Sequence, residues 1–411
     1  MTAPSAYTPD SRHAWIRLFI SLVLAVVGGI GLWLAVVVLP TIQAEFGVDR
    51  AGASFPYTAT FLGFAAGGFV MGKLADRFGI TVPITIAGVA LGAGFFLAAI
   101  STSYWQFVAV QAVFIGFLGS AATFGPLVAD ASQWFLKRRG IAIAIVASGN
   151  YIAGAIWPPF MQAAIQSYGW RWTYMAIGVL CVVVMVPGAQ LLRKRPHFHD
   201  SASPASRGAG QKGLLPRHRF LFPALVLAGL SCCVAMSMPQ VHIVAYCADL
   251  GYGPARGAEM LSIMLGFGVL SRLVSGLVAD KLGGLTTLIA GSAMQTLALI
   301  AYIPFDGLAS LYVVSAIFGL SQGGIVPSYA LIIRDHFPAR EAGTRISTVL
   351  TATVFGMALG GWMSGEIYDW TGSYTMAFLN GVAWNVLNLS IALWILFVRY
   401  PRSPSLTPAA A

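Results

Sequence analysis

The stretch Gly72–Gly79, GKLADRFG, returns later in the chain as Gly276–Gly283, GLVADKLG. Each matched position lies at one constant offset along the chain. A second pair follows the same repeat with one inserted residue: Phe135–Gly140, FLKRRG, and Phe337–Gly343, FPAREAG. Two copies of one pattern predict a chain built from two similar halves.

The composition predicts a membrane protein. Of 411 residues, 57% are hydrophobic and 9% are charged, against about 25% charged in an ordinary soluble domain. Apolar blocks such as Leu18–Leu39 and Ala224–Val244 have the roughly 20 residues that a helix needs to cross the hydrocarbon core. Their Leu, Ala and Gly content argues against the alternating segments of a β-barrel. We expect twelve spanning helices, centred near residues 28, 62, 90, 118, 151, 181, 233, 268, 294, 320, 356 and 387.

The placement of basic residues predicts the orientation. Of the 24 Lys and Arg residues, only Arg50, Arg171 and Arg256 fall in the expected outer loops, and Arg272 falls within a span. The rest fall in the tails and cytoplasmic loops, as the positive-inside rule requires. We therefore expect a multi-pass protein of a bacterial-type inner membrane with both termini cytoplasmic. The net charge of +10 then reports orientation, and we expect no nucleic-acid partner.

A polar segment with Pro, Ser, Gly and many charges divides the spans into six and six. It predicts a cytoplasmic linker at residues 193–219. The expected domains are an N-terminal six-helix bundle, residues 1–192, and a C-terminal six-helix bundle, residues 220–411.

The repeated element resembles the signature of the major facilitator superfamily, Gly-x-Leu-Ala-Asp-Arg-x-Gly, and the resemblance spans essentially the whole chain. It implies two parallel six-helix repeats and secondary transport. By its position, the element predicts that Gly72 allows a close helix approach and that Asp76 and Asp280 make contacts that form in one gate state and break in another. For Lys73 and Arg77 the alternative is a role in topology alone. The expected gating residues are Gly72, Asp76, Arg77, Gly276, Asp280 and Lys281.

Arg272 is the most informative residue for function. It lies within the eighth span, about four residues or ~6 Å on the cytoplasmic side of the midpoint. An arginine at this depth costs about 2.5–3.5 kcal/mol on insertion scales, so it is expected to face a polar cavity and to bind an anion. Its guanidinium matches a carboxylate. The alternative is an internal ion pair, for which Asp130 and Glu366, expected near cytoplasmic helix ends, and Glu259, expected near the outside, are poor candidates.

His242 is the histidine expected within a span, toward the outer end of the seventh helix. It is predicted either to contact substrate or a coupling proton, or to be satisfied by a backbone carbonyl. His242 and Asp130 are the candidate titrating groups for proton coupling.

The run from His242 through Asp249-Leu-Gly251 to Ser271-Arg272 resembles the bacterial monocarboxylate-porter group, relatives of the oxalate:formate antiporter. In that group the eighth-helix arginine binds the substrate carboxylate, and Arg272 stands at the matching place. The eleventh span, 346–365, lacks the lysine that gives the oxalate carrier a second positive charge. The first span also lacks the acidic residue and lysine of the animal monocarboxylate carriers. One cation fits a monoanion better than a dianion.

Aromatic and amide residues at comparable depth are expected to complete the cavity, since aromatic walls with a few polar groups are typical of small-ligand sites. Ordinary packing is the alternative for each aromatic, and the amides are the stronger candidates because an unpaired amide in lipid is costly. The set is Trp33, Phe124, Asn150, Tyr151, Gln322, Tyr329 and Phe355.

The sequence thus predicts a secondary transporter of a small organic anion, a monocarboxylate, by proton symport or anion exchange. The rivals are a cation or drug:proton antiporter, which would need an acid at mid-depth, and a non-transporting membrane sensor. No nucleophile–base pair, metal cluster or phosphate loop stands out, so we expect no enzyme, no metal and no cofactor. The expected partners are the anion, membrane lipid and possible coupling protons, and we expect a monomer.

Overall fold

A computed structural model describes residues 9–193, 220–337 and 339–399, and throughout these ranges the regular structure is helical. Short connections join the helices, as expected where backbone groups must be satisfied within each span. The first half contains α1 (Arg12–Gly28), α2 (Ile30–Val37), α3 (Leu39–Phe46), α4 (Arg50–Phe78), α5 (Thr81–Ala99), α6 (Tyr104–Val110), the π-helix η1 (Gln111–Gly119), the 3₁₀ helix η2 (Ser120–Thr123), α7 (Gly125–Trp134), α8 (Arg139–Ala147), α9 (Gly149–Tyr168) and α10 (Trp170–Leu191). The second half contains α11 (Leu221–Asp249), α12 (Pro254–Leu282), α13 (Gly284–Ala301), α14 (Leu308–Gln322), α15 (Ile325–His336), α16 (Ala339–Thr371) and α17 (Tyr374–Arg399).

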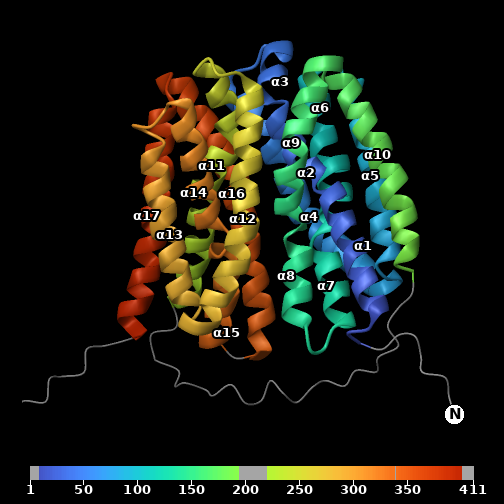
Figure 1. Cartoon of the computed structure of the whole chain (residues 1–411), viewed down its shortest axis with the longest axis vertical. Helices are drawn as coiled ribbons and strands as arrows, with labels where there is room; N and C mark the ends of the chain where they lie inside the picture. Colours follow the sequence, from blue (N-terminus) through green and yellow to red (C-terminus); the bar gives the residue numbers. More distant parts are fainter. Residues whose placement is uncertain (1–8, 194–219, 338, 400–411) are drawn as a thin grey trace, which may run out of the picture.

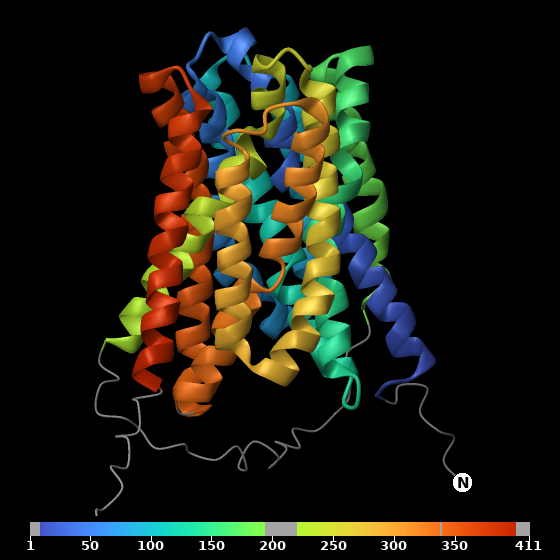
Figure 2. The same ribbon diagram turned by 60° about the vertical axis from the view of Figure 1, so that its left-hand side comes forward.

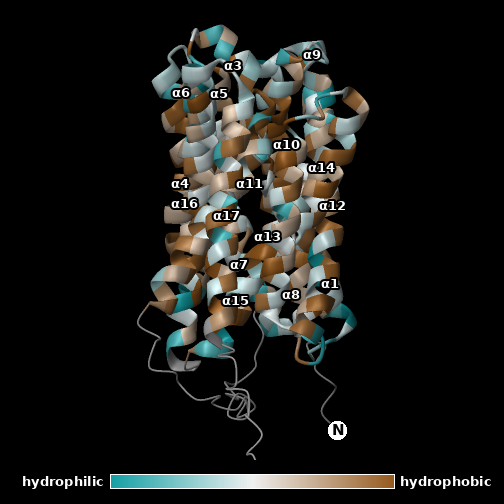
Figure 3. Ribbon diagram, turned by 90° about the vertical axis from the view of Figure 1, so that its left-hand side faces the viewer, coloured by the Kyte–Doolittle hydropathy of each residue, from teal (hydrophilic) through white to brown (hydrophobic). Residues whose placement is uncertain are grey.

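The described residues form twelve helical segments long and apolar enough to cross a membrane. The expected centres all fall inside these segments, so the prediction of twelve spans is confirmed. In Figure 3, hydrophobic residues dominate the middle of the helices and hydrophilic residues gather toward both ends. This banding is what a lipid-facing surface requires.

The helices of the two halves lie side by side along one common direction. Figure 1 shows the first half, blue to green, on one side and the second half, yellow to red, on the other, and Figure 2 shows the same helices from a second direction. We call the end at which α1 begins and α17 ends the terminal end, and the opposite end the distal end. The predicted linker, residues 193–219, falls almost wholly outside the described residues.

The sequence repeat has a structural counterpart. Gly79 ends α4 with φ 84° and ψ 168°, and Gly283 ends α12 with φ 84° and ψ 161°. Side-chain-bearing residues rarely adopt a positive φ of this kind, so the last glycine of each copy is needed to turn the chain. The two copies therefore make the same turn at the terminal end of the second and eighth spans.

Several spans are interrupted near mid-depth. The fourth span passes from η1 through η2 and breaks at Phe124, and α7 then starts with Gly125 and Pro126. The tenth span breaks at Gly323 and Gly324. The fifth span breaks at Ser148 between α8 and α9. The fourth and tenth spans occupy corresponding places in the two halves, and interrupted helices in corresponding places point to a binding site.

Candidate functional site

Arg272 meets only neutral groups. Its Nη1 donates to the carbonyl oxygen of Ala147 at 2.8 Å, and its guanidinium carbon lies 4.4 Å from the centre of the Tyr151 ring. Its Nε is buried and has no hydrogen-bond partner among the described residues. No carboxylate of the described residues forms an ion pair with Arg272. The alternative, that Arg272 belongs to an internal ion pair, therefore has no support among the described residues, and none of them neutralises the charge of Arg272.

The helix breaks explain the position of Arg272. Ala147 is the last residue of α8, where backbone carbonyls lack partners and carry partial negative charge, so a cation is favoured there. Gly323 lies on the other side: a Cβ at this position would stand 2.4 Å from the backbone nitrogen of Arg272. Ser271 of α12 satisfies backbone groups at the break of the tenth span. Its hydroxyl donates to Leu320 O at 2.5 Å and accepts from Gly323 N at 3.2 Å.

Three residues of the predicted cavity set belong to the first half and meet near Arg272. The indole Nε1 of Trp33 donates to the backbone oxygen of Asn150 at 3.0 Å and to its Oδ1 at 3.1 Å. Tyr151 packs against the second half, because a Cβ at Gly268 would lie 2.6 Å from its ring. Asn150 thus finds a partner inside the protein, and Tyr151 forms a wall beside the guanidinium.

The amide of Gln322 belongs to a pair that we did not predict from the sequence. Its Nε2 donates to Met264 O at 3.4 Å, and its Oε1 accepts from Nε2 of Gln240. Gln240 is 2% exposed, and its Oε1 has no partner among the described residues. An amide within a span is costly unless it is paired, so the sequence could have indicated Gln240 for the same reason as Asn150 and Gln322.

The other aromatic residues of the set take different positions. Phe124, at the break of the fourth span, is 37% exposed, and Phe355 on α16 is 47% exposed. Tyr329 is fully buried, and its hydroxyl donates to Asn388 Oδ1 at 2.8 Å. Asn388 in turn donates to Ser292 on α13. The structure therefore places the hydroxyl of Tyr329 in a polar network within the second half.

His242 lies near the distal end and is fully buried. Its Nε2 lies 2.8 Å from Gly361 O, and its Nδ1 lies 3.1 Å from the hydroxyl of Tyr374. Because a carbonyl oxygen only accepts, Nε2 carries the hydrogen, and in the neutral ring Nδ1 accepts from Tyr374. Of the two predicted arrangements, the structure shows the one in which a backbone carbonyl satisfies the ring of His242. Neither ring nitrogen contacts Arg272.

Asp130 is paired inside the first half. Arg17 holds it with two hydrogen bonds, Nε to Oδ2 at 2.9 Å and Nη2 to Oδ1 at 2.8 Å. The two side chains are 4% and 10% exposed. Asp130 and Asp76 line a cavity of about 790 Å³ at the terminal end. This cavity is formed by first-half residues and does not include Arg272.

Glu366 lies at the distal end, opposite to Asp130, so the prediction that both acids lie near cytoplasmic helix ends is wrong for Glu366. The eleventh span runs from the terminal to the distal end, so its last residues lie beside Asp49 at the start of α4. Glu366 is near the end of α16, so the direction in which the eleventh span runs places its carboxylate at the distal end.

Contacts between the halves seal the distal end. The guanidinium of Arg50 on α4 reaches Asp249 on α11 at 2.9 Å. Asp369 on α16 accepts from the backbone N–H groups of Arg50 at 2.9 Å and Ala51 at 2.7 Å. Nearer mid-depth, Thr58 Oγ1 donates to Ala358 O at 2.7 Å. These hydrogen bonds hold α4 against the second half.

The terminal end is separated in this conformation. Among the described hydrogen bonds between the halves, the one nearest this end joins Arg272 and Ala147. A Cβ at Gly72 or Gly276 would meet no atom within 4 Å. The expected close approach of a helix at Gly72 is therefore not present in this conformation. The predicted gating residues with charged side chains are all exposed at this end: Asp76, Arg77, Asp280 and Lys281.

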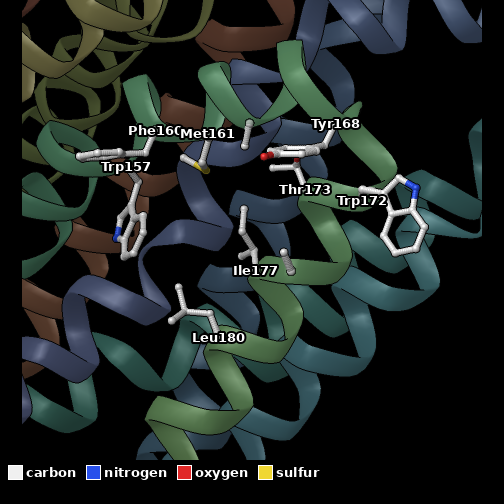
Figure 4. Close-up of a pocket in the computed structure, with 10 residues that line it drawn as sticks. Trp157, Phe160, Met161, Tyr168, Trp172, Thr173, Ile177 and Leu180 are labelled. Carbon is white, nitrogen blue, oxygen red and sulfur yellow. The ribbon is translucent and has the colours of Figure 1, made fainter.

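A large apolar groove lies elsewhere, on the outside of the first half. Figure 4 shows Trp157, Phe160, Met161 and Tyr168 of α9 beside Trp172 and other residues of α10. The groove has a volume of about 650 Å³. Exposed aromatic side chains at this position suit a lipid-facing surface. It is lined by α9 and α10 alone and adds nothing to the polar site at Arg272.

Comparison with known proteins identifies the family. The model of the Major Facilitator Superfamily matches residues 21–349 and 296–411. An MFS-type transporter of Gibberella moniliformis is 27% identical over 74% of this chain and 73% of its own length. Monocarboxylate transporter 13 of Bos taurus is 25% identical over 74% of this chain and 71% of its own length.

Solved structures agree on the fold. The nucleoside transporter NupG has a TM-score of 0.72 at 13% identity, covering 92% of this chain and 99% of its own. A bacterial homologue of the lysosomal transporter Spinster has a TM-score of 0.70 at 14% identity, covering 97% and 98%. Relatives are named as transporters rather than enzymes. With twelve spans, two six-helix repeats and a family match over most of its length, this chain belongs to the Major Facilitator Superfamily of multi-pass membrane transporters.

Proposed function

We propose that the protein carries a small organic anion, a monocarboxylate, across the membrane by alternating access, with Arg272 as the anion-binding group. One observation carries the proposal: Arg272 lies within a span, and among the described residues its buried Nε has no hydrogen-bond partner and its guanidinium pairs with no carboxylate. The carbonyl of Ala147 and the ring of Tyr151 orient the guanidinium without neutralising it. A bound carboxylate supplies the missing charge and two acceptor oxygens.

A single carboxylate is favoured over two. Among the described spans, the other arginines and lysines lie toward the ends or, as Arg17 and Arg50, are already paired with aspartates. One unpaired cation suits a monoanion. The name of the bovine relative, monocarboxylate transporter 13, is consistent with this class. Another relative, of Saccharomyces cerevisiae, is named a riboflavin transporter, and one of Paecilomyces divaricatus is named an efflux protein of agnestins.

The rival of a cation or drug:proton antiporter needs an acidic side chain at mid-depth. The described acids of the spans, including Asp130, Glu259 and Glu366, lie toward the helix ends. A membrane sensor without transport would show binding at Arg272 but no flux. Uptake into proteoliposomes therefore separates the sensor from the carrier.

Coupling is by proton symport or by anion exchange. Symport predicts uptake that rises with an inward proton gradient, and exchange predicts uptake that depends on anion loaded on the other side. Asp130 and His242 remain the candidate titrating groups, and both are already hydrogen-bonded in this conformation. A group that titrates during transport must exchange these partners in another conformation.

We further propose that the terminal end is cytoplasmic, so that both termini are inside, and that the membrane is a bacterial-type inner membrane. The excess of Lys and Arg in the described connections at the terminal end supports this orientation. Asp76 and Asp280 then close the cytoplasmic side in the opposite conformation. We propose that the monomer transports, since each chain contains both halves.

A thermal-shift screen tests the site. Purified protein is exposed to mono- and dicarboxylates beside Arg272→Ala, with Arg256→Ala, at the exposed distal pair with Glu259, as the matched control. A ligand at 100 times its dissociation constant adds about 2.7 kcal/mol of apparent stability. Stabilisation by monocarboxylates that is lost only in Arg272→Ala supports the proposal. Stabilisation by carboxylates that Arg272→Ala retains, or by cations or neutral compounds alone, overturns it.

A further inference from the structure

A second site lies at the distal end, where the two halves meet. A cavity of about 530 Å³ is bounded on one side by the start of α4 and α6 and on the other side by α16. It is adjacent to a close approach of α16 and α4, since a Cβ at Gly365 would stand 2.7 Å from Ala51 Cα. The lining residues that matter here are Asp49, Phe55, Tyr104, Trp105, Trp362 and Glu366.

Aromatic rings form much of the wall. Trp105 packs edge to face against Tyr104, with 5.1 Å between ring centres, and against Phe55 at 6.2 Å. Trp362 joins from α16 and is 37% exposed. Trp362 and Glu366 are four residues apart, so they lie on the same face of α16. The faces of tryptophan rings attract cations, and more so when water is partly excluded.

Glu366 carries a charge that no described residue compensates. It is half-buried and forms neither a hydrogen bond nor an ion pair with any residue that the structure describes. Two other carboxylates of this end contrast with it: Asp249 pairs with Arg50, and Glu45 pairs with Arg171. Asp49, beside Glu366, accepts from Gly52 N at 2.7 Å and caps α4, so the positive end of that helix is already neutralised.

From this combination we infer that the cavity binds an organic cation of the alkylammonium class. Glu366 provides the opposite charge, and Trp362 and Trp105 provide aromatic contacts on both sides of the interface. The walls come from different halves, so the complete site exists only while the distal end is closed. A cation bound there holds α16 against α4 and α6. This site is distinct from Arg272 and does not depend on the nature of the transported anion.

A trimethylammonium group can come from two sources, a free cation or the head group of phosphatidylcholine. The chemistry is the same, and the depth of Glu366 near the end of its span admits both. The two sources separate in membranes of defined composition. In phosphatidylglycerol nanodiscs the cavity has no lipid trimethylammonium group to bind, whereas in phosphatidylcholine nanodiscs the head group competes with added cation.

The test measures binding of tetramethylammonium and choline to the full chain by thermal shift and calorimetry. Glu366→Gln and Trp362→Leu are each expected to weaken binding about tenfold or more, since a cation–π contact or a partly buried charge is worth about 1–2 kcal/mol. Asp306→Asn, in an exposed distal loop, and Trp370→Leu, on exposed α16 surface, match these changes in chemistry and are expected to leave binding unaltered.

Each result decides the inference. Binding in detergent and phosphatidylglycerol that disappears in phosphatidylcholine identifies the lipid head group as occupant, and equal binding in all three identifies a free cation. Absence of binding by the wild-type protein in detergent and phosphatidylglycerol overturns the inference, as does binding that Glu366→Gln retains in full. Carboxylate binding at Arg272 is measured in the same samples, so the two proposals fail separately.

Discussion

Arg50 on α4 and Asp249 on α11 join the two halves of the molecule, with 2.9 Å between guanidinium Nη2 and carboxylate Oδ1. The guanidinium also lies 4.7 Å from the centre of the Tyr368 ring. Arg50 is 6% exposed, whereas the side chain of Asp249 is 32% exposed. The pair thus lies at the boundary between the protein interior and solvent, and it forms only when the distal end is closed.

We expect Asp249→Asn to shift the conformational equilibrium toward an open distal end. A partly exposed ion pair contributes on the order of 1 kcal/mol, which is about a fivefold change in the ratio of closed to open molecules. Spin labels at Tyr168→Cys and Trp370→Cys, both exposed at the distal end, report the separation, and the four native cysteines are buried. Glu259→Gln, which breaks a pair within one half, is the control; an equal shift there would contradict the assignment.

Gly365→Ala should open the distal end by steric conflict. The new Cβ would stand 2.7 Å from Ala51 Cα and 2.9 Å from Arg50 O, and both are backbone atoms that cannot rotate away. Overpacking of this kind costs about 1–3 kcal/mol. Gly72→Ala, which meets no atom within 4 Å, is expected to leave the distance between the same labels unchanged. A short label distance that persists in Gly365→Ala would contradict this packing.

Arg272→Lys should retain the positive charge but weaken transport. Lysine cannot present the planar pair of donors that a carboxylate accepts, and it reaches Ala147 O with different geometry. We expect KM for a monocarboxylate to rise on the order of tenfold, about 1.4 kcal/mol, with a smaller change in the maximal rate. Uptake into proteoliposomes measures both parameters. Unchanged KM would mean that Arg272 acts as a simple charge.

Asp130→Asn should be strongly destabilising because it leaves the charge of Arg17 buried and unpaired. Breaking a buried ion pair from one side costs about 3–5 kcal/mol. Arg17→Met in the same chain should recover part of this loss. Thermal unfolding of the two single variants and the double variant measures the coupling, with Glu341→Gln, at an exposed pair with Arg345, as the control. Additive losses in the double variant would show that the two side chains do not stabilise one another.

Asp10, outside the spans, should make the connection before α8 sensitive to acid. Its carboxylate accepts from the backbone N–H groups of Lys137 at 3.0 Å and of Leu136 and Arg138 at 3.2 Å. These hydrogen bonds hold the pKa of Asp10 below its usual value of 3.8, and the bond from Lys137 N–H has the largest effect. The stabilisation is therefore present above about pH 4 and is lost as the pH falls through the lowered pKa.

Hydrogen exchange at residues 136–138, corrected for the intrinsic rate, measures this effect. Protection at pH 7 should fall in Asp10→Asn, and the difference between wild type and variant should shrink as the pH falls through the lowered pKa of Asp10 and the carboxylate is protonated. A difference that persists at low pH would assign the protection to packing instead of the carboxylate.

Much of the fold follows from the sequence because the bilayer imposes a simple constraint: a spanning segment must be long, apolar and helical. The repeat at Gly72–Gly79 and Gly276–Gly283 predicted two similar halves, and in the structure Gly79 and Gly283, the last glycines of the two copies, have the same positive φ. Arg272 was identified because a charge within a span is rare. These signals are local and need no knowledge of neighbouring helices.

Side-chain partners were harder to predict. Tyr329 has the depth of a cavity residue, but its hydroxyl bonds Asn388, some sixty residues later in the chain. Gln240 was missed because its partner, Gln322, belongs to another span. Which face of a helix meets which neighbour depends on rotation about the helix axis, and spans that are apolar on nearly all sides give little periodicity from which to derive it.

The breaks at Phe124, Ser148 and Gly323–Gly324 divide the fourth, fifth and tenth spans into two stacked segments each. A continuous helix tilts as a rod, whereas an interrupted one can bend where its backbone hydrogen bonds are already missing. α7, α8 and α15 can then move inward at the terminal end while the distal segments stay packed. These three spans each have a joint near mid-depth, and the hydrogen bond from Arg272 to Ala147 O links the two halves at the joint of the fifth span, so the side chain that we propose for anion binding is also fastened to a joint.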